Sequence, residues 1–144
     1  MILISHRGNT YGSFPLIENK PEYIDDTISL GFDVEVDVWM VDDTFYLGHD
    51  YPLYNITQHW LYERKNKLWI HCKNKEAFEW FNILSNTYNY FWHENDFGVL
   101  TSQGYIWSIN IFKQGILVLP EKFDKHPIEN TLGVCSDYIL NYKK

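Results

Sequence analysis

The first hundred residues of this chain alternate between strand-like and helix-like segments, whereas the last third does not. The expected strands, rich in β-branched and aromatic residues, are 2–8, 32–40, 68–74 and 90–96. The expected helices are 18–31, 56–65 and 75–85. This order predicts parallel βαβ units. Residues 99–121 and 133–140 continue with short strands and almost no room for helices.

The length of the chain limits which parallel fold it can form. A (β/α)₈ barrel takes about 250 residues, whereas this chain has 144. Eight strands of roughly five residues fit into that length, but eight helices of about eleven residues do not. We therefore expect one α/β domain over residues 1–144, a minimal (β/α) TIM-like barrel with several helices missing in the C-terminal half. An open, partly wound sheet is the competing architecture.

Composition and charge exclude several classes of protein. Apolar residues make up 45% of the chain, which is enough for a sizeable core. The formal net charge is −7, so no broad basic surface for nucleic acid or anionic lipid is expected. The chain has no apolar run of about 20 residues for a membrane span, and the run 2–4 is too short for a signal peptide. We expect a cytoplasmic protein in which Cys72 and Cys135 are reduced.

Two carboxylates interrupt the valines of strand 32–40. Because strand side chains alternate, Glu35 and Asp37 point to one face, although parallel strands are normally apolar on both faces. Burying two neighbouring carboxylates is costly or shifts their pKa values upward. A bound divalent cation would remove this cost, and oxygen ligands suit Mg²⁺, Ca²⁺ or Mn²⁺. A hydrogen-bonded polar pair at a strand end is the alternative.

Further polar residues follow the neighbouring strands. His6 and Arg7 end the first strand, and His49 and Asp50 come after the second. Sites in parallel α/β folds assemble where the carboxyl ends of the strands meet. We therefore expect two imidazoles and a guanidinium to converge on the two carboxylates.

The ordered motifs resemble the signature of a known family. His-Arg-Gly at 6–8, Glu-x-Asp at 35–37 and Gly-His-Asp at 48–50 look like the pattern of the glycerophosphodiester phosphodiesterases. The resemblance covers residues 2–74 and is more diffuse afterwards, where 133–139 is similar to the family's closing strand. It implies a TIM barrel of the phospholipase-C-like phosphodiesterase superfamily. It also implies metal-dependent hydrolysis of glycerophosphodiesters in lipid metabolism, giving glycerol 3-phosphate and an alcohol.

The resemblance also implies roles for the matching residues. His6 and His49 would form the acid/base pair, with no order assigned between them. Arg7 would bind phosphate, and Lys73 matches a lysine that lies near the phosphate in the family. These roles suit phosphodiester cleavage, which needs neutralisation of the anion and two proton transfers near neutral pH.

The implied metal ligands include one departure from the family. Glu35 and Asp37 match two of its ligands, but His71 stands where the family commonly has a glutamate. One divalent cation is expected, Mg²⁺ or Ca²⁺. If His71 supplies a nitrogen ligand, Mn²⁺ or Zn²⁺ gains a better chance. The same replacement could instead weaken or abolish metal binding.

Less specific signals concern the rim of the expected site. His93 and Glu121 follow later strands and could line the pocket, and Trp107 could stack on a substrate or pack in the core. Asn19 is the predicted N-cap of helix 18–31, and Glu18 is a candidate contact at the rim.

Two other functions stay open at this point. A lyase-like phospholipase would stop at a cyclic phosphate. A catalytically impaired module would bind phosphate or glycerophosphate without turnover, because of the replacement at His71. In each case we expect a small-molecule phosphodiester ligand, no nucleic acid and no membrane span. A barrel flank without helices favours a homo-oligomer.

Overall fold

Ten strands join into one mixed sheet in the computed structural model, which describes residues 1–84 and 86–144. The strands are β1 (Ile2–His6), β2 (Asp33–Val41), β3 (Thr44–Leu47), β4 (Tyr54–Ile56), β5 (Leu68–Cys72), β6 (Asn89–Phe91), β7 (Gly98–Leu100), β8 (Ile106–Ser108), β9 (Gly115–Val118) and β10 (Gly133–Ser136). The α-helices of the described residues are α1 (Pro21–Ser29), α2 (Gln58–Arg64) and α3 (Lys75–Ile83), and η1 (Pro120–Lys122) and η2 (Ile139–Tyr142) are 3₁₀ turns. The predicted helix 75–85 thus ends at Ile83, and Ser85 lies outside the described residues.

The centre of the sheet is parallel. β6, β5, β2, β1, β10, β9 and β8 lie side by side in this order, and each neighbouring pair is parallel. The βαβ units predicted for the first part of the chain are therefore confirmed, because α1 connects β1 to β2 and α3 connects β5 to β6. Antiparallel strands flank this centre: β7 pairs with β8, and β3 and β4 continue from the far half of β2.

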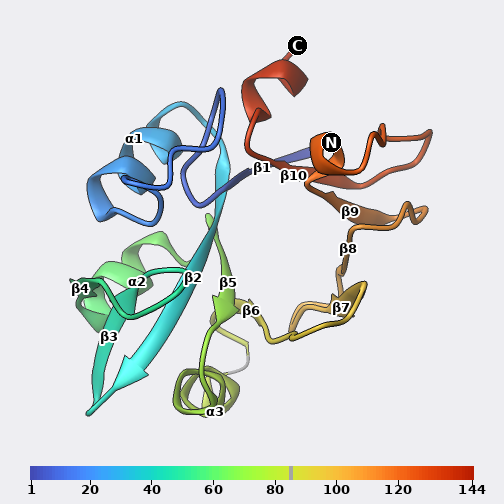
Figure 1. The fold of residues 1–144 in the computed structure, drawn as a ribbon. Coiled ribbons are helices and arrows are strands. Elements are labelled where there is room, and N and C mark those ends of the chain that lie inside the picture. Colours follow the sequence, from blue (N-terminus) through green and yellow to red (C-terminus); the bar gives the residue numbers. More distant parts are fainter. Residues whose placement is uncertain (85) are drawn as a thin grey trace.

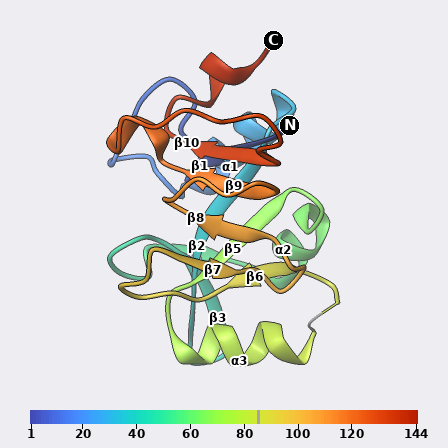
Figure 2. The ribbon, with the colours of Figure 1, turned by 90° about the vertical axis from the view of Figure 1, so that its right-hand side faces the viewer.

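The predicted minimal TIM-like barrel is wrong. The sheet is a half-barrel of parallel and antiparallel strands with three α-helices among the described residues. The reason is two short connections, since residues 42–43 turn β2 back into β3 and 101–105 turn β7 back into β8, which makes both pairs antiparallel. Neither connection has room for a packed helix. In Figure 1 the helices α1, α2 and α3 lie beside β2 and β5, and Figure 2 shows β8, β9 and β10 side by side without an α-helix of the described residues in front of them.

The sheet separates two hydrophobic cores. On the outer side the helices pack on the valines of β2, together with residues of β5; this core includes Ile24, Val34, Val36, Val38, Leu61, Ile70, Ala77 and Phe81. On the inner side large side chains fill the curve of the sheet, namely Ile4, Trp69, Phe91, Trp107 and Ile116. Since side chains alternate along β2, Glu35 and Asp37 face the inner side. Cys72 belongs to the outer core and Cys135 to the inner core, and both are free thiols.

Local sequence explains where two helices begin. The side chains of Thr57 and Asn74 accept hydrogen bonds from the backbone N–H groups of Trp60 and Ala77, which caps α2 and α3. These caps leave the first turns of both helices with fewer unpaired donors.

The predicted cap of α1 is wrong. Lys20 is the N-cap residue, and no side chain caps this end of the helix. Asn19 lies one residue earlier in a left-handed conformation, with φ +63°, and its side chain binds Asp37. The polar residue before α1 therefore belongs to the inner face of the sheet.

Trp107 lies in the inner core. It is 4% exposed, and its ring centroid is 4.8 Å from that of Phe91 and 5.7 Å from that of Trp69. We expect Trp107→Ala to lower the free energy of unfolding by about 3–5 kcal/mol, because it leaves a large cavity. Urea denaturation measures this change. Parent-like stability combined with weaker phosphodiester binding would instead identify the indole as a substrate contact.

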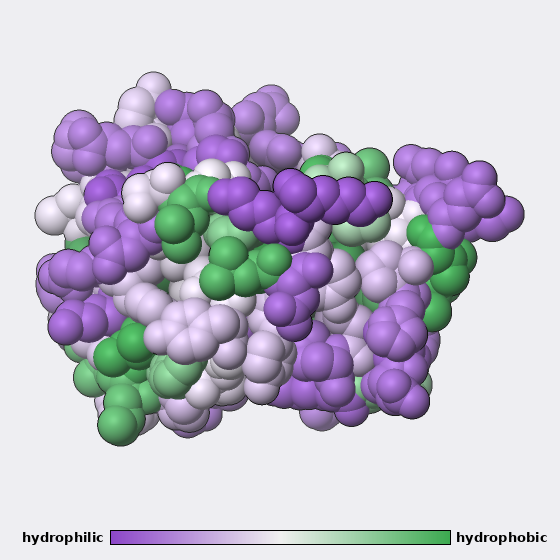
Figure 3. Space-filling model, turned by 90° about the horizontal axis from the view of Figure 1, so that it is seen from above, coloured by the Kyte–Doolittle hydropathy of each residue, from purple (hydrophilic) through white to green (hydrophobic). Residues whose placement is uncertain are grey.

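The surface seen in Figure 3 is largely hydrophilic, with hydrophobic groups separated by polar ones. Within the part of the chain that the structure describes, none of the helices has both the length and the apolar character needed to cross a membrane.

Candidate functional site

β2 carries the two predicted acids through the parallel centre of the sheet, between β1 and β5. The strand register places Glu35 beside His6 on β1 and Asp37 beside His71 on β5. Glu35 is 2% exposed and Asp37 is fully buried. Strand register thus gathers these four side chains inside the curve of the sheet.

Glu35, Asp37 and His71 form a cluster that could hold a metal ion, because one ligand atom from each lies within 4.8 Å of the others. Nδ1 of His71 is 3.8 Å from Oε1 of Glu35 and 3.2 Å from Oδ1 of Asp37. Two buried oxygens, Oε2 of Glu35 and Oδ1 of Asp37, accept no hydrogen bond from the residues that the structure describes. Buried carboxylate oxygens without a donor are costly, and hard cations bind such oxygens. The donor set therefore fits a divalent cation.

Two cationic side chains lie beside these carboxylates. Nε of Arg7 is 3.0 Å from Oδ2 of Asp37, and Nζ of Lys73 is 3.8 Å from Oδ1 of the same residue. Burial by itself raises the pKa of Asp37, but the neighbouring imidazole and the two cations outweigh it and bring the pKa below its ordinary value. Burial, followed by the charge of Asp37, raises the pKa of Glu35 well above its ordinary value. Asp37 is therefore a compensated carboxylate, whereas the charge of Glu35 lacks full compensation.

Asn19 holds Asp37 in place and was missed as a site residue. Its Nδ2 donates to Oδ2 of Asp37 at 2.9 Å, and its Oδ1 accepts from the backbone N–H of Asp37 at 3.0 Å. The adjacent Glu18 accepts hydrogen bonds from Arg7 and Asn9 at 3.2 and 2.8 Å. The Glu-Asn pair therefore positions one metal-cluster carboxylate and one cation. Glu18 was predicted as a contact at the rim, whereas the position of Asn19 before a helix favoured a cap.

A buried carboxylate orients His6. Nδ1 of His6 is 2.6 Å from Oδ1 of Asp137, which follows β10, and Nδ2 of Asn9 donates to the same oxygen at 2.9 Å. Because a carboxylate only accepts, Nδ1 carries the proton and Nε2 is the free acceptor of the neutral ring. This Nε2 lies 3.9 Å from Oε2 of Glu35. Asp137 was not among the predicted residues, since 131 positions separate it from His6 and only the folded sheet joins them.

The environment of Asp137 allows a prediction of how the stability of the fold changes at low pH. Burial raises the pKa of Asp137, but hydrogen bonds from His6 and Asn9 outweigh burial and bring the pKa below its ordinary value. Such a group stabilises the fold above its unfolded pKa of about 3.9 and loses this contribution as the pH falls through the folded pKa. We expect Asp137→Asn to be less stable than the parent at pH 7 and to lose less stability below about pH 4. Urea midpoints across this range measure both effects, and parallel pH curves would contradict the assignment.

His49 lines a pocket of about 260 Å³ beside the cluster. The other walls include Arg7, Ser13, Pro15, Glu18, Asn19, Asp50, Tyr51 and Leu53. Nδ1 of His49 is 2.8 Å from Oδ1 of Asp50. Burial, followed by the positive charge of Arg7, lowers the pKa of His49. The pocket thus places an imidazole and a guanidinium together at the edge of the metal cluster.

His93 packs on the cluster from the segment that follows β6. Its ring centroid is 4.6 Å from that of His71, with the two planes 5° apart, and Phe91 stacks on His71 at 5.1 Å. Burial, followed by the charge of His71, lowers the pKa of His93. The stack fixes the plane of the His71 ring, so His93 supports the cluster through His71.

Glu121 faces the end of β10. Its Oε1 accepts from the backbone N–H of Asp137 at 2.8 Å, and its Oε2 accepts from the hydroxyl of Ser136 at 3.0 Å. It therefore holds the turn that carries Asp137. Of the predicted rim residues, Glu121 and His93 act on the site through a neighbour, and Trp107 belongs to the core beneath it.

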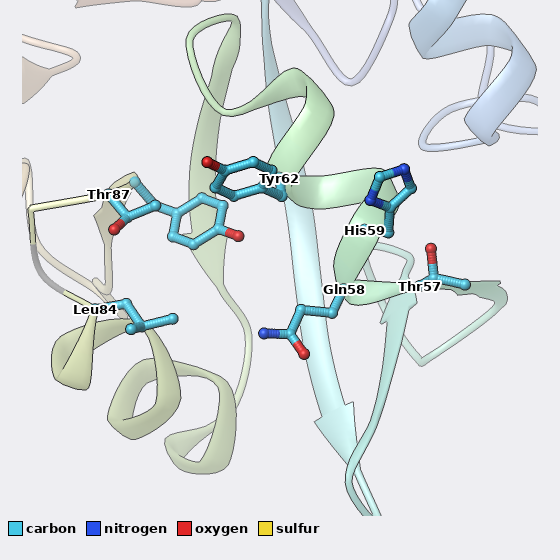
Figure 4. Close-up of a pocket in the computed structure, with 7 residues that line it drawn as sticks. Thr57, Gln58, His59, Tyr62, Leu84 and Thr87 are labelled. Carbon is cyan, nitrogen blue, oxygen red and sulfur yellow. The ribbon is translucent and has the colours of Figure 1, made fainter.

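A wider hollow of about 600 Å³ lies elsewhere, between α2 and the segment that leads into β6 (Figure 4). Thr57, Gln58, His59, Tyr62, Leu84, Thr87 and Tyr88 line it. None of these residues belongs to the metal cluster, so size alone does not identify the site.

Comparisons of this chain with protein-family models, with curated proteins and with solved structures give no match. The geometry of the cluster and its pocket therefore carries the functional argument.

Proposed function

We propose that this chain is a metal-dependent phosphodiesterase that hydrolyses glycerophosphodiester-type substrates. The observation that carries the proposal is a pair of buried carboxylate oxygens that accept no hydrogen bond from the described residues, Oε2 of Glu35 and Oδ1 of Asp37, next to His6 and Arg7. Buried polar oxygens nearly always have a partner, and a bound cation would supply one here. The similarity of the His-Arg, Glu-x-Asp and His-Asp motifs to the glycerophosphodiester phosphodiesterases supports the same reaction.

Glu35, Asp37 and His71 would hold one divalent cation. Two carboxylates favour Mg²⁺ or Ca²⁺, whereas the imidazole shifts the preference toward Mn²⁺ or Zn²⁺. Such a cation supplies Lewis-acid polarisation of a phosphoryl oxygen and neutralises charge in the transition state. His71 is suited to ligation because Phe91 and His93 hold its ring in one plane.

Arg7 and Lys73 bind the phosphate in this proposal. Both lie within 4 Å of Asp37, and Arg7 also lines the pocket that contains His49. Their positive charges attract the substrate anion into a protein whose net charge is negative. Glu18 fixes the orientation of the Arg7 guanidinium.

His6 and His49 perform the two proton transfers. Each ring has its Nδ1 held by a carboxylate, Asp137 for His6 and Asp50 for His49. Nε2 is therefore the atom on each ring that exchanges a proton with the nucleophile or the leaving oxygen. The nucleophile is water for hydrolysis and a substrate hydroxyl for the lyase route.

The test is a metal titration of the metal-stripped protein with Mg²⁺, Ca²⁺, Mn²⁺ and Zn²⁺. Turnover of a chromogenic phosphodiester and of glycerophosphodiesters is followed in the parent, in Glu35→Gln and in the exposed control Glu79→Gln. We expect metal-dependent turnover in the parent and the control, and none in Glu35→Gln. Metal binding without turnover of any substrate would replace the enzyme with a phosphate-binding module, and a cyclic phosphate seen by phosphorus NMR would replace the hydrolase with a lyase.

A further inference from the structure

A second polar pocket lies at the amino ends of the parallel strands. It has a volume of about 180 Å³. The first residues of four strands line it, namely Ile2 of β1, Asp33 of β2, Leu68 of β5 and Asn89 of β6. These four strands run in the same direction, so the pocket and the metal cluster lie toward opposite ends of the sheet. We call it the amino-end pocket.

Apolar side chains separate the amino-end pocket from the metal cluster. Along β1, the inner face carries Ile2 at the pocket, Ile4 in the inner core and His6 beside the cluster. On β6, Phe91 lies in the inner core two residues after Asn89. A molecule in the amino-end pocket would therefore be separated from the metal ligands by packed side chains.

Asn89 brings a buried amide without a partner into this pocket. It is 5% exposed, and its Oδ1 accepts no hydrogen bond from the residues that the structure describes. Asn89 lies beside Trp69 in the register of β5 and β6, so both side chains point to the inner side of the sheet. Buried polar oxygens nearly always have a partner. We therefore expect a molecule in the pocket to donate to Oδ1 of Asn89.

The size of the pocket limits what this molecule can be. A water molecule occupies roughly 30 Å³ in the liquid, so one water would leave most of the space empty. Sites for drug-sized ligands have about 300–1,000 Å³. The amino-end pocket therefore suits a compound no larger than a monosaccharide.

The charges around the pocket favour a neutral compound. Asp33 is already paired, because Nζ of Lys67 donates to its Oδ1 at 2.9 Å and Nε1 of Trp69 donates to its Oδ2 at 3.1 Å. Lys65 also lines the pocket and would repel a cation. An anion that only accepts hydrogen bonds could not satisfy Oδ1 of Asn89, since this oxygen is itself an acceptor.

The remaining polar groups favour hydroxyl groups on the ligand. Asn66 and Gln103 line the pocket together with Asn89 and are exposed amides. An amide side chain both donates and accepts hydrogen bonds, and so does a hydroxyl group. Tyr105, whose ring centroid is 4.9 Å from that of Trp69, adds an aromatic wall for the C–H groups of such a compound.

We propose that the amino-end pocket binds a small neutral polyhydroxyl compound, up to the size of a monosaccharide, with a hydroxyl group donating to Oδ1 of Asn89. This binding does not depend on the proposed phosphodiesterase function, because the pocket shares no residue with the metal cluster.

The test is calorimetric titration of the protein with glucose, myo-inositol and glycerol. Glucosamine and glucuronate serve as charged counterparts. We expect at least one of the three neutral compounds to bind, and the charged counterparts to bind more weakly than it does. Glu35→Gln should bind the neutral compound like the parent, because the inner core separates Glu35 from the pocket.

Asn89→Leu should weaken this binding at least tenfold without lowering the stability of the ligand-free protein, because it removes an amide that has no partner among the described residues. Asn55→Leu is the matched control. Asn55 is exposed on β4 and does not line the pocket, so this variant should keep the parent affinity. Gln103→Ala changes an exposed turn residue and should weaken binding several-fold, which keeps the test decisive if Asn89→Leu does not fold.

Several results would overturn the proposal. Absence of binding by all three neutral compounds, or tighter binding of a charged counterpart, would exclude the proposed class of ligand. Equal losses in Asn89→Leu and Asn55→Leu, or parent-like affinity in Gln103→Ala, would place the compound elsewhere, and loss of binding in Glu35→Gln would place it at the metal cluster. Lower stability of ligand-free Asn89→Leu would show that the amide has a structural partner, such as a bound water.

Discussion

Replacing Glu35 by Gln is expected to make the metal-free protein more stable and to abolish its stabilisation by metal. In the metal-free parent the Glu35 carboxylate is buried beside Asp37, and its Oε2 has no hydrogen-bond donor among the described residues. Removing its charge relieves this cost, so we expect the free energy of unfolding to rise by about 1–2 kcal/mol. At one hundred times Kd, metal binding adds about 2.7 kcal/mol to the parent, and this gain should disappear in Glu35→Gln. Thermal unfolding with and without Mn²⁺ measures both changes.

The pH dependence of the metal-free protein provides a second measurement of the same effect. Burial, followed by the charge of Asp37, raises the folded pKa of Glu35 above its unfolded value of about 4.3. Because the folded pKa is raised, the contribution of Glu35 to the stability of the fold is fully present below the unfolded pKa. This contribution is lost as the pH rises through the folded pKa. The parent should therefore lose stability from about pH 4.3 upward, and Glu35→Gln should lose less. Glu79→Gln, on the exposed face of α3, should follow the parent, and a parent-like curve for Glu35→Gln would show that the carboxylate is already compensated without metal.

His6→Gln is expected to lower kcat for phosphodiester hydrolysis by about 10³-fold while leaving metal affinity unchanged. The amide keeps a hydrogen-bond donor for Asp137 but cannot exchange a proton near neutral pH, and general acid–base catalysis contributes about 10²–10⁴-fold. Steady-state kinetics in saturating metal measures kcat, and calorimetric titration measures the metal affinity.

Two variants separate the chemistry of His6 from its packing. Asp137→Asn should reduce kcat by a smaller factor than His6→Gln and change its pH profile, since it alters the orientation and charge of the imidazole. His59→Gln, on the surface of α2, should keep the full kcat. If His6→Gln weakened metal binding as much as it lowered kcat, His6 would belong to the metal site and would not act in proton transfer.

The cluster shows why a parallel sheet is an effective frame for such a site. β1, β2 and β5 run in the same direction and in register, so His6, Glu35, Asp37 and His71 occupy neighbouring positions on one face. Strand backbones hold these side chains more rigidly than loops would. The groups that contact or position them, such as Arg7, Asn19 and Asp137, come from the chain segments that follow or connect the strands.

Local patterns identified much of this arrangement. The alternation along β2 placed Glu35 and Asp37 on one face, and the strand–helix–strand order predicted that His6, Arg7 and His49 would meet them. His71 and Lys73 were added by the family resemblance. These features depend on the alternation of side chains along a strand and on the helices that connect successive strands. Both follow from short stretches of sequence. Length and charge were equally informative, because they excluded a full set of barrel helices and a broad basic surface.

The tertiary structure decided what depends on distant residues. Strand order in the sheet, the half-barrel in place of a (β/α) barrel and the pairing of His6 with Asp137 all join segments that are far apart in the chain. Asn19 illustrates the limit best, since its position before α1 fits a cap, but its side chain binds the buried carboxylate of Asp37 on β2. A local hydrogen bond is worth about 1 kcal/mol, and one to a buried charge is worth about 1.5–3 kcal/mol. The sequence by itself thus determined which residue types share a face, and only packing decided which partners those residues bind.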